Sequence, residues 1–93
     1  MVILYLTITL HAPWCGSLKD KRSEIRRLTA AAGSKFNISV CESHEQDTHR
    51  IIGLSICALA FHRAQADSMA EEILRFVESA TQAELISSEQ EYR

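Results

Sequence analysis

The sequence has no long hydrophobic run, little glycine and an odd number of cysteines, and each of these limits what the protein can be. Its most apolar stretch, Met1–Leu10, is too short for a membrane span and lacks a basic region ahead of it, so we expect neither a membrane anchor nor a secretory signal. The three glycines are isolated, which excludes a glycine-rich loop around a phosphate. Three cysteines without a secretory signal indicate reduced thiols in the cytosol.

Length and composition indicate one ordinary folded unit. A chain of 93 residues predicts a single domain over residues 1–93. At 46% hydrophobic and 24% charged residues, the composition is that of a globular protein. No nucleophile elbow and no spacing typical of a catalytic triad is present. We therefore expect a non-catalytic protein that needs no cofactor and no metal ion.

The hydrophobic pattern predicts six elements in the order βαββαβ. Apolar residues at helical spacing indicate a helix over residues 18–32, which Gly33 would end, and a second helix over residues 64–80. Each helix has a single apolar stripe, so both should cover the same face of an antiparallel sheet in an α+β fold. Alternating residues indicate the strands of this sheet at Val2–Leu10, Lys35–Glu42, Arg50–Ala60 and Glu84–Glu91.

The opposite face of the predicted sheet has no helix to cover it. Its apolar groups are Ile3, Ile51 and Leu59, and such a face is suited to contact with a second copy of the chain. With Tyr5 as its only aromatic residue, it is a poor platform for stacking RNA bases, because RNA-recognition sheets use several aromatic residues. The other residues predicted on this face are Thr7, Thr9, Asn37, Ser39, Ser55 and Cys57.

The segment Ser17–Arg22 begins the first helix and concentrates positive charge. Ser17 is a good N-cap, and Asp20 stands three residues later, where an acid favours the helix start. Residues 17–35 carry six Lys or Arg and two Asp or Glu, which gives a local charge of +4. The rest of the chain carries four Lys or Arg and ten Asp or Glu, which gives a local charge of −6. This asymmetry supports an anion-binding or nucleic-acid-binding surface on the first helix, and a merely solvated helix face is the alternative that the sequence leaves open.

The candidate binding residues on this helix fall into two groups. Lys19, Arg22 and Arg26 have i, i+3, i+7 spacing, so they line up along one flank of the helix as a basic ridge. Lys21 falls within the apolar sector, and we expect its stem to lie over the core while its ammonium reaches out beside the ridge. The predicted binding residues are thus Lys19, Lys21, Arg22 and Arg26.

The same segment carries a family resemblance. Ser17–Arg22, together with Phe36–Val40 and Gln46-Asp47, resembles the YlxP-like family of small uncharacterised bacterial proteins, and the resemblance extends to Arg75–Glu78. It implies a ferredoxin-like βαββαβ fold with two helices on one face of an antiparallel sheet, and no established activity. Relatives are often encoded beside translation and ribosome-maturation genes. The resemblance therefore points to ribosomal RNA or a ribosome-associated partner for the basic helix.

A second interpretation rests on Cys15. The stretch Ala12–Gly16 resembles the entry to a thioredoxin active site, and a cysteine ahead of a helix N-terminus, with Lys19 close by, should have a lowered pKa. Thioredoxins also need a second cysteine, where Leu18 stands here, and a later cis-proline, whereas Pro13 is the only proline. A monothiol redox role for Cys15 is the alternative that these residues leave open.

Cysteine and histidine also gather in the predicted hairpin. Cys41, His44 and His49 have the spacing C-x2-H-x4-H, and both residue types are zinc ligands. A structural zinc site needs a fourth ligand, and this loop offers only carboxylates. We therefore interpret these residues as part of a polar loop.

Overall fold

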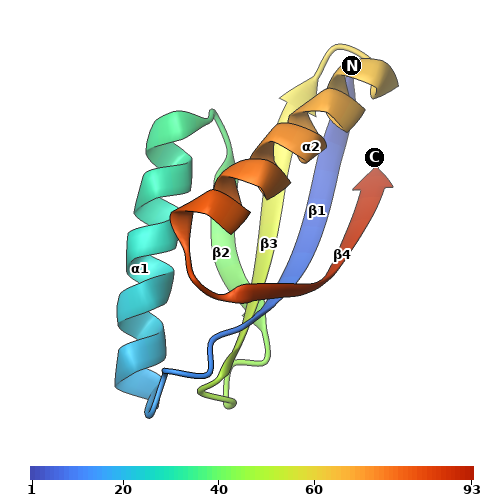
Figure 1. The fold of residues 1–93 in the computed structure, drawn as a ribbon. Helices are drawn as coiled ribbons and strands as arrows, with labels where there is room; N and C mark the ends of the chain where they lie inside the picture. The colour runs from blue at the N-terminus through green and yellow to red at the C-terminus, as the bar shows by residue number, and fades with distance from the viewer.

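The computed structural model describes residues 1–93, which form one four-stranded sheet and two helices (Figure 1). The strands lie in the order β2-β3-β1-β4, and every neighbouring pair is antiparallel. This is the predicted ferredoxin-like α+β fold. In chain order the elements are β1 (Val2–His11), α1 (Leu18–Lys35), β2 (Ser39–His44), β3 (Ile51–Ala60), α2 (Arg63–Ala80) and β4 (Glu84–Tyr92).

The centre of the sheet is the pair β1 and β3. Their register runs over ten positions, from Val2 opposite Ala60 to His11 opposite Ile51. The two helices cover one face of the sheet, and the hydrophobic core lies between the helices and that face (Figure 1). The predicted alternation along β1 is confirmed, because its even positions from residue 4 onward are fully buried: Leu4, Leu6, Ile8 and Leu10.

The junction between α1 and β2 differs from the prediction. We expected Gly33 to end the helix, but α1 continues to Lys35, and the backbone N–H of Phe36 closes its last turn on the carbonyl of Ala32 at 2.9 Å. Consequently β2 begins at Ser39 instead of Lys35. The link between them still contributes to the core, since Phe36 packs edge-on against Phe76 with ring centroids 5.5 Å apart.

The second helix begins one residue earlier than predicted because a histidine caps it. The Nδ1 atom of His62 accepts a hydrogen bond from the backbone N–H of Gln65 at 3.2 Å. The side-chain oxygen of Gln65 accepts in turn from the backbone N–H of Phe61 at 2.6 Å. This reciprocal pair of hydrogen bonds resembles a capping box in which His62 replaces the usual Ser or Thr. Neither α1 nor α2 is long and apolar enough to cross a membrane.

Candidate functional site

The first turn of α1 is held by a reciprocal pair of side chains. Ser17, the N-cap residue, accepts a hydrogen bond at Oγ from the backbone N–H of Asp20 at 3.1 Å. The carboxylate of Asp20 accepts from the backbone N–H of Gly16 at 3.0 Å. Backbone N–H groups at the start of a helix have no acceptor within the helix. This pair of side chains supplies acceptors for two backbone N–H groups at the start of α1. The predicted capping role of Ser17 and Asp20 is confirmed.

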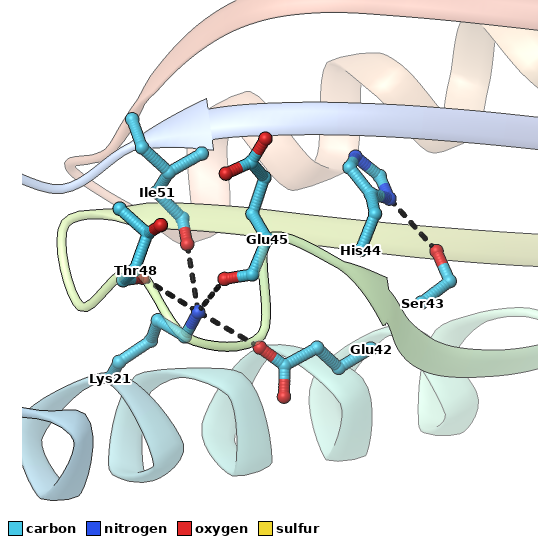
Figure 2. Close-up of polar contacts among 7 residues, drawn as sticks. All are labelled: Lys21, Glu42, Ser43, His44, Glu45, Thr48 and Ile51. Carbon is cyan, nitrogen blue, oxygen red and sulfur yellow. Dashed lines mark hydrogen bonds and ion pairs between the residues drawn. The ribbon is translucent and has the colours of Figure 1, made fainter.

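Lys21 lies inside the protein, with 1% of its side chain exposed. Its ammonium donates hydrogen bonds to the carbonyl oxygens of Glu45 (2.6 Å), Thr48 (2.8 Å) and Ile51 (2.9 Å), all in or beside the loop between β2 and β3 (Figure 2). A lysine ammonium has three N–H donors, so these bonds use all of them. The Glu42 carboxylate, 3.0 Å from the same nitrogen, therefore balances the charge without receiving a hydrogen bond of its own.

The position of Lys21 corrects the predicted binding surface. We expected its ammonium to reach solvent beside the basic ridge. Instead the carbonyls of the β2–β3 hairpin enclose it, because a charged group inside a protein is stable only when its donors find acceptors. Lys21 therefore ties α1 to this hairpin and is not available to an external ligand.

The basic ridge of Lys19, Arg22 and Arg26 is exposed along α1, and Lys35 is a further exposed cation at the end of the helix. None of these side chains takes part in an ion pair, whereas Arg27, on the same helix, lies 2.6 Å from the carboxylate of Glu24. From Lys19 to Arg26 the ridge extends about 10 Å along the helix, at 1.5 Å per residue. Its three positive charges are therefore free to meet an anion.

Cys15 is fully buried in the loop between β1 and α1. Burial raises the pKa of its thiol, and the charges of Asp20 and Glu24 raise this pKa further, while Lys21 opposes them. The prediction of a lowered pKa, drawn from the helix N-terminus and Lys19, is wrong, because the cost of removing a thiolate from water is the largest effect. At neutral pH Cys15 is a protonated thiol shielded from solvent.

Side chains from β1, β2 and β3 form a continuous hydrogen-bonded chain on the uncovered face of the sheet. Tyr5 OH lies 3.1 Å from Ser55 Oγ, which donates to Ser43 Oγ at 2.7 Å. Ser43 Oγ lies 2.9 Å from Nδ1 of His44, and Nε2 of His44 lies 2.9 Å from Thr9 Oγ1 (Figure 2 shows the link between Ser43 and His44). We call this set the hydroxyl–imidazole chain. It engages both ring nitrogens of His44.

Gly53 makes room for the His44 ring. The pairing of β2 with β3 shifts register between Glu42 and His44, where His44 comes to lie opposite Gly53. A β-carbon on Gly53 would lie 2.5 Å from Cγ and Cδ2 of the ring and closer still to the His44 carbonyl oxygen. The sequence prediction missed this arrangement because it ended the strand at Glu42. An isolated glycine within a strand was the available signal, since it often marks a bulge or a close approach.

The C-x2-H-x4-H spacing of the hairpin does not assemble a metal site. Nowhere in the chain do three or more His, Cys, Asp or Glu side chains come together in a group that could hold a metal ion. His44 is occupied by the hydroxyls of Ser43 and Thr9, on the uncovered face of the sheet. The histidine therefore belongs to the hydroxyl–imidazole chain.

These features define a small ferredoxin-like α+β protein with an exposed basic helix. A family model described as "Protein of unknown function (DUF503)" matches residues 3–90. The chain is also 33% identical over 69 residues to "Uncharacterized protein YlxP" of Bacillus subtilis (strain 168), a match that covers 74% of this chain and 75% of that protein. The chain therefore belongs to the DUF503 family, and the YlxP-like resemblance is confirmed.

Proposed function

We propose that this protein is a non-catalytic RNA-binding protein of the cytosol whose basic ridge contacts the phosphates of ribosomal RNA. The observation that carries the proposal is that Lys19, Arg22 and Arg26 are exposed on one flank of α1 without an ion-pair partner. Lys21, which lies between Lys19 and Arg22 in the sequence, is used inside the fold. The charge of the ridge is thus left for an external polyanion.

The charge distribution supports an approach through α1. Residues 17–35 carry a local charge of +4 and the rest of the chain a local charge of −6. The acidic remainder disfavours a polyanion, so the charge distribution favours contact through α1. Contacts with about three phosphates release about as many counterions, which makes binding weak and strongly dependent on salt.

Co-sedimentation with ribosomal subunits and with protein-free ribosomal RNA tests the proposal. At low salt the protein should sediment with at least one of these fractions, and added salt should release it, because the contacts are electrostatic. The fraction that it follows identifies the partner. A protein that stays in the supernatant with both fractions at low salt would remove the proposal.

The redox alternative has less support. A reactive cysteine needs an accessible thiolate, but Cys15 is buried and burial raises the pKa of its thiol. Cys41 is exposed, yet it lies on a different element from the helix start on which the alternative was based. We therefore keep a monothiol role for Cys15 only as the alternative to be tested by alkylation.

A homodimer through the uncovered sheet face is a second candidate function, because three of its strands present no formally charged side chain there. Interface centres are depleted in charged residues, and ion pairs are left to the rim. Here the charged groups come from β4 and its end: Arg93, paired with Glu91 at 2.8 Å, places its guanidinium 5.0 Å from the centre of the Tyr5 ring. The uncharged residues, in strand order, are Ile3, Tyr5, Thr7, Thr9, His11, Ser39, Cys41, Ser43, His44, Ile51, Gly53, Ser55, Cys57 and Leu59.

The oligomeric state in solution tests this second candidate. Light scattering should give the mass of a dimer at high concentration, and Leu59→Asp should return the protein to a monomer, since Leu59 is 64% exposed on this face. The matched control is Ile86→Asp, at an exposed apolar residue of the edge strand β4, whereas Leu59 lies on the interior strand β3. A wild-type protein that remains monomeric at high concentration would rule the homodimer out.

A further inference from the structure

Trp14, the only tryptophan of the chain, is 48% exposed at the entrance to α1. It borders a cleft of about 450 Å³ between the middle of α1 and the end of α2. A volume of this size falls within the range of about 300–1,000 Å³ that is usual for small-ligand sites. The cleft is lined by Trp14, Glu24, Arg27, Ser79, Ala80, Thr81 and Gln82.

The charges of this cleft are balanced within it. The Glu24 carboxylate accepts hydrogen bonds from Nε and Nη2 of Arg27, at 3.1 and 2.6 Å, and from Thr81 Oγ1 at 2.6 Å. These bonds hold a carboxylate and a guanidinium together as a neutral pair. A phosphate group would therefore gain little electrostatic attraction in the cleft. An uncharged ligand does not depend on such attraction, so the neutral cleft suits it better.

The same residues offer a planar surface beside free hydrogen-bonding groups. Arg27 has five N–H donors, of which Glu24 uses two, so three remain. Gln82 is exposed and its amide has no hydrogen-bond partner in the protein. The last carbonyls of α2, at Ser79 and Ala80, have no intrahelical partner. An aromatic ring next to both donors and acceptors suits a flat, polar and uncharged ligand.

We propose that this cleft binds an unpaired base of single-stranded RNA, stacked on Trp14 and hydrogen-bonded by Arg27 and Gln82. The proposal rests on the RNA-binding function of the basic ridge and names the class of RNA that the ridge holds. Single-stranded loops and ends are recognised by stacking their exposed bases on aromatic side chains. On the uncovered sheet face the one aromatic ring, that of Tyr5, already has the guanidinium of Arg93 over it, whereas Trp14 is 48% exposed at the cleft.

The ridge and the cleft lie on opposite flanks of α1. Arg22 and Arg26 follow one flank, and Glu24 and Arg27 follow the other, which faces α2. The exposed Ser23 lies on the outer surface between the two flanks. A helix with its side chains is about 10–12 Å across, so a few nucleotides of a single strand that crosses α1 reach from one flank to the other.

The fluorescence of Trp14 reports base stacking directly, because no other tryptophan contributes. The wild-type protein is titrated at low salt with a short single-stranded oligoadenylate and, separately, with inorganic polyphosphate, which has the charges of an RNA backbone but no bases. We expect both ligands to bind, as followed by ligand-dependent sedimentation, and only the oligoadenylate to quench Trp14. If both ligands bind but quench Trp14 equally, or if neither quenches it, the proposal of a base-binding cleft is overturned and the proposal of the basic ridge stands. If neither ligand binds, both proposals fail.

A pair of variants separates stacking from general binding. Trp14→Leu should weaken oligoadenylate binding about five-fold to a hundred-fold, the range expected for loss of one stacked base, and leave polyphosphate binding unchanged. Trp14→Phe keeps an aromatic ring and should recover most of the affinity. Because Trp14 is half-exposed, both variants should fold, which thermal unfolding checks. An equal loss for both ligands, or no loss for either, would contradict the proposal.

Discussion

The ammonium of Lys21 lies 2.6 Å from the carbonyl oxygen of Glu45, which is 24 residues further along the chain. This contact divides the segment Ser17–Arg22 into two parts with different tasks. Ser17, Asp20 and Lys21 begin α1 and fasten it to the β2–β3 hairpin. Lys19 and Arg22 face outward and start the basic ridge. One short segment therefore serves both the fold and the proposed binding surface.

Replacing Lys21 should destabilise the protein strongly. Lys21→Met keeps the length of the stem but leaves three carbonyl oxygens and the Glu42 carboxylate without their cation. Removing one partner of a buried charge pair costs about 3 kcal/mol in free energy of unfolding. Urea denaturation measures this loss, and the matched control is Lys19→Met, which should stay within about 0.5 kcal/mol of wild type. Equal stability of the two variants would show that the Lys21 contacts do not hold the hairpin.

Adding a methyl group at Gly53 should disturb the hairpin through His44. In Gly53→Ala the new β-carbon meets both the ring and the carbonyl oxygen of His44, so we expect a loss of about 2 kcal/mol in free energy of unfolding. The double variant Gly53→Ala, His44→Ala removes the ring but not the carbonyl, and it should recover part of this loss. Comparison with His44→Ala alone isolates the steric effect. Full tolerance of Gly53→Ala would contradict the close approach of the two strands at this bulge.

Alkylation should find Cys15 unreactive around neutral pH. Its raised pKa and its burial both lower the fraction of accessible thiolate, so its modification by iodoacetamide should lag far behind that of the exposed Cys41 in the same molecule. Peptide mass spectrometry over a pH series measures both sites at once. The pKa of the Cys15 thiol is higher in the folded protein than in the unfolded chain, where it is that of an ordinary thiol, about 8.5. The contribution of Cys15 to stability is therefore fully present below the unfolded pKa and disappears as the pH rises through the folded pKa. Rapid labelling of Cys15 below pH 7 would instead restore the redox alternative.

Glu24 should stabilise the protein at neutral pH and lose this effect in acid. The hydrogen bonds from Arg27, followed by the one from Thr81, lower the pKa of its carboxyl group. A lowered folded pKa means that the contribution is present above the unfolded pKa, about 4.3, and disappears as the pH falls through the folded value. Glu24→Gln should therefore cost about 1 kcal/mol in free energy of unfolding at neutral pH, and the difference from wild type should shrink in acid. Glu71→Gln, on the exposed side of α2, is the control.

The fold could be predicted because its signal is local. Every buried position on β1 follows a period of two, and each helix shows one apolar stripe, so element order and layer arrangement were available from the chain alone. The predicted end of the first helix at Gly33 is wrong because Gly33 does not adopt the left-handed conformation. The last turn of α1 is closed instead by the backbone N–H of Phe36. Local preference at a single residue was weaker than the packing of the whole helix.

The candidate site was less predictable because its key contacts join distant residues. The inward direction of Lys21 follows from its place in the apolar sector, but its carbonyl partners come from a loop that no local pattern describes. His44, the last residue of β2, comes to lie opposite Gly53 through a register shift after Glu42, which strict alternation along the strand does not predict. The burial of Cys15 depends on how its loop folds back onto the core. Sequence spacing alone does not contain this information.

The salt dependence of RNA binding tests the central claim most directly. The triple variant Lys19→Gln, Arg22→Gln, Arg26→Gln is compared with Arg50→Gln, Arg63→Gln, Arg75→Gln, which changes the net charge equally but leaves the basic ridge intact. The slope of log affinity against log salt concentration should fall by about 2 for the ridge variant, at about 0.7 for each single-strand phosphate contact, and should change little for the control. Equal slopes for the two variants would contradict the basic ridge as the RNA-binding surface.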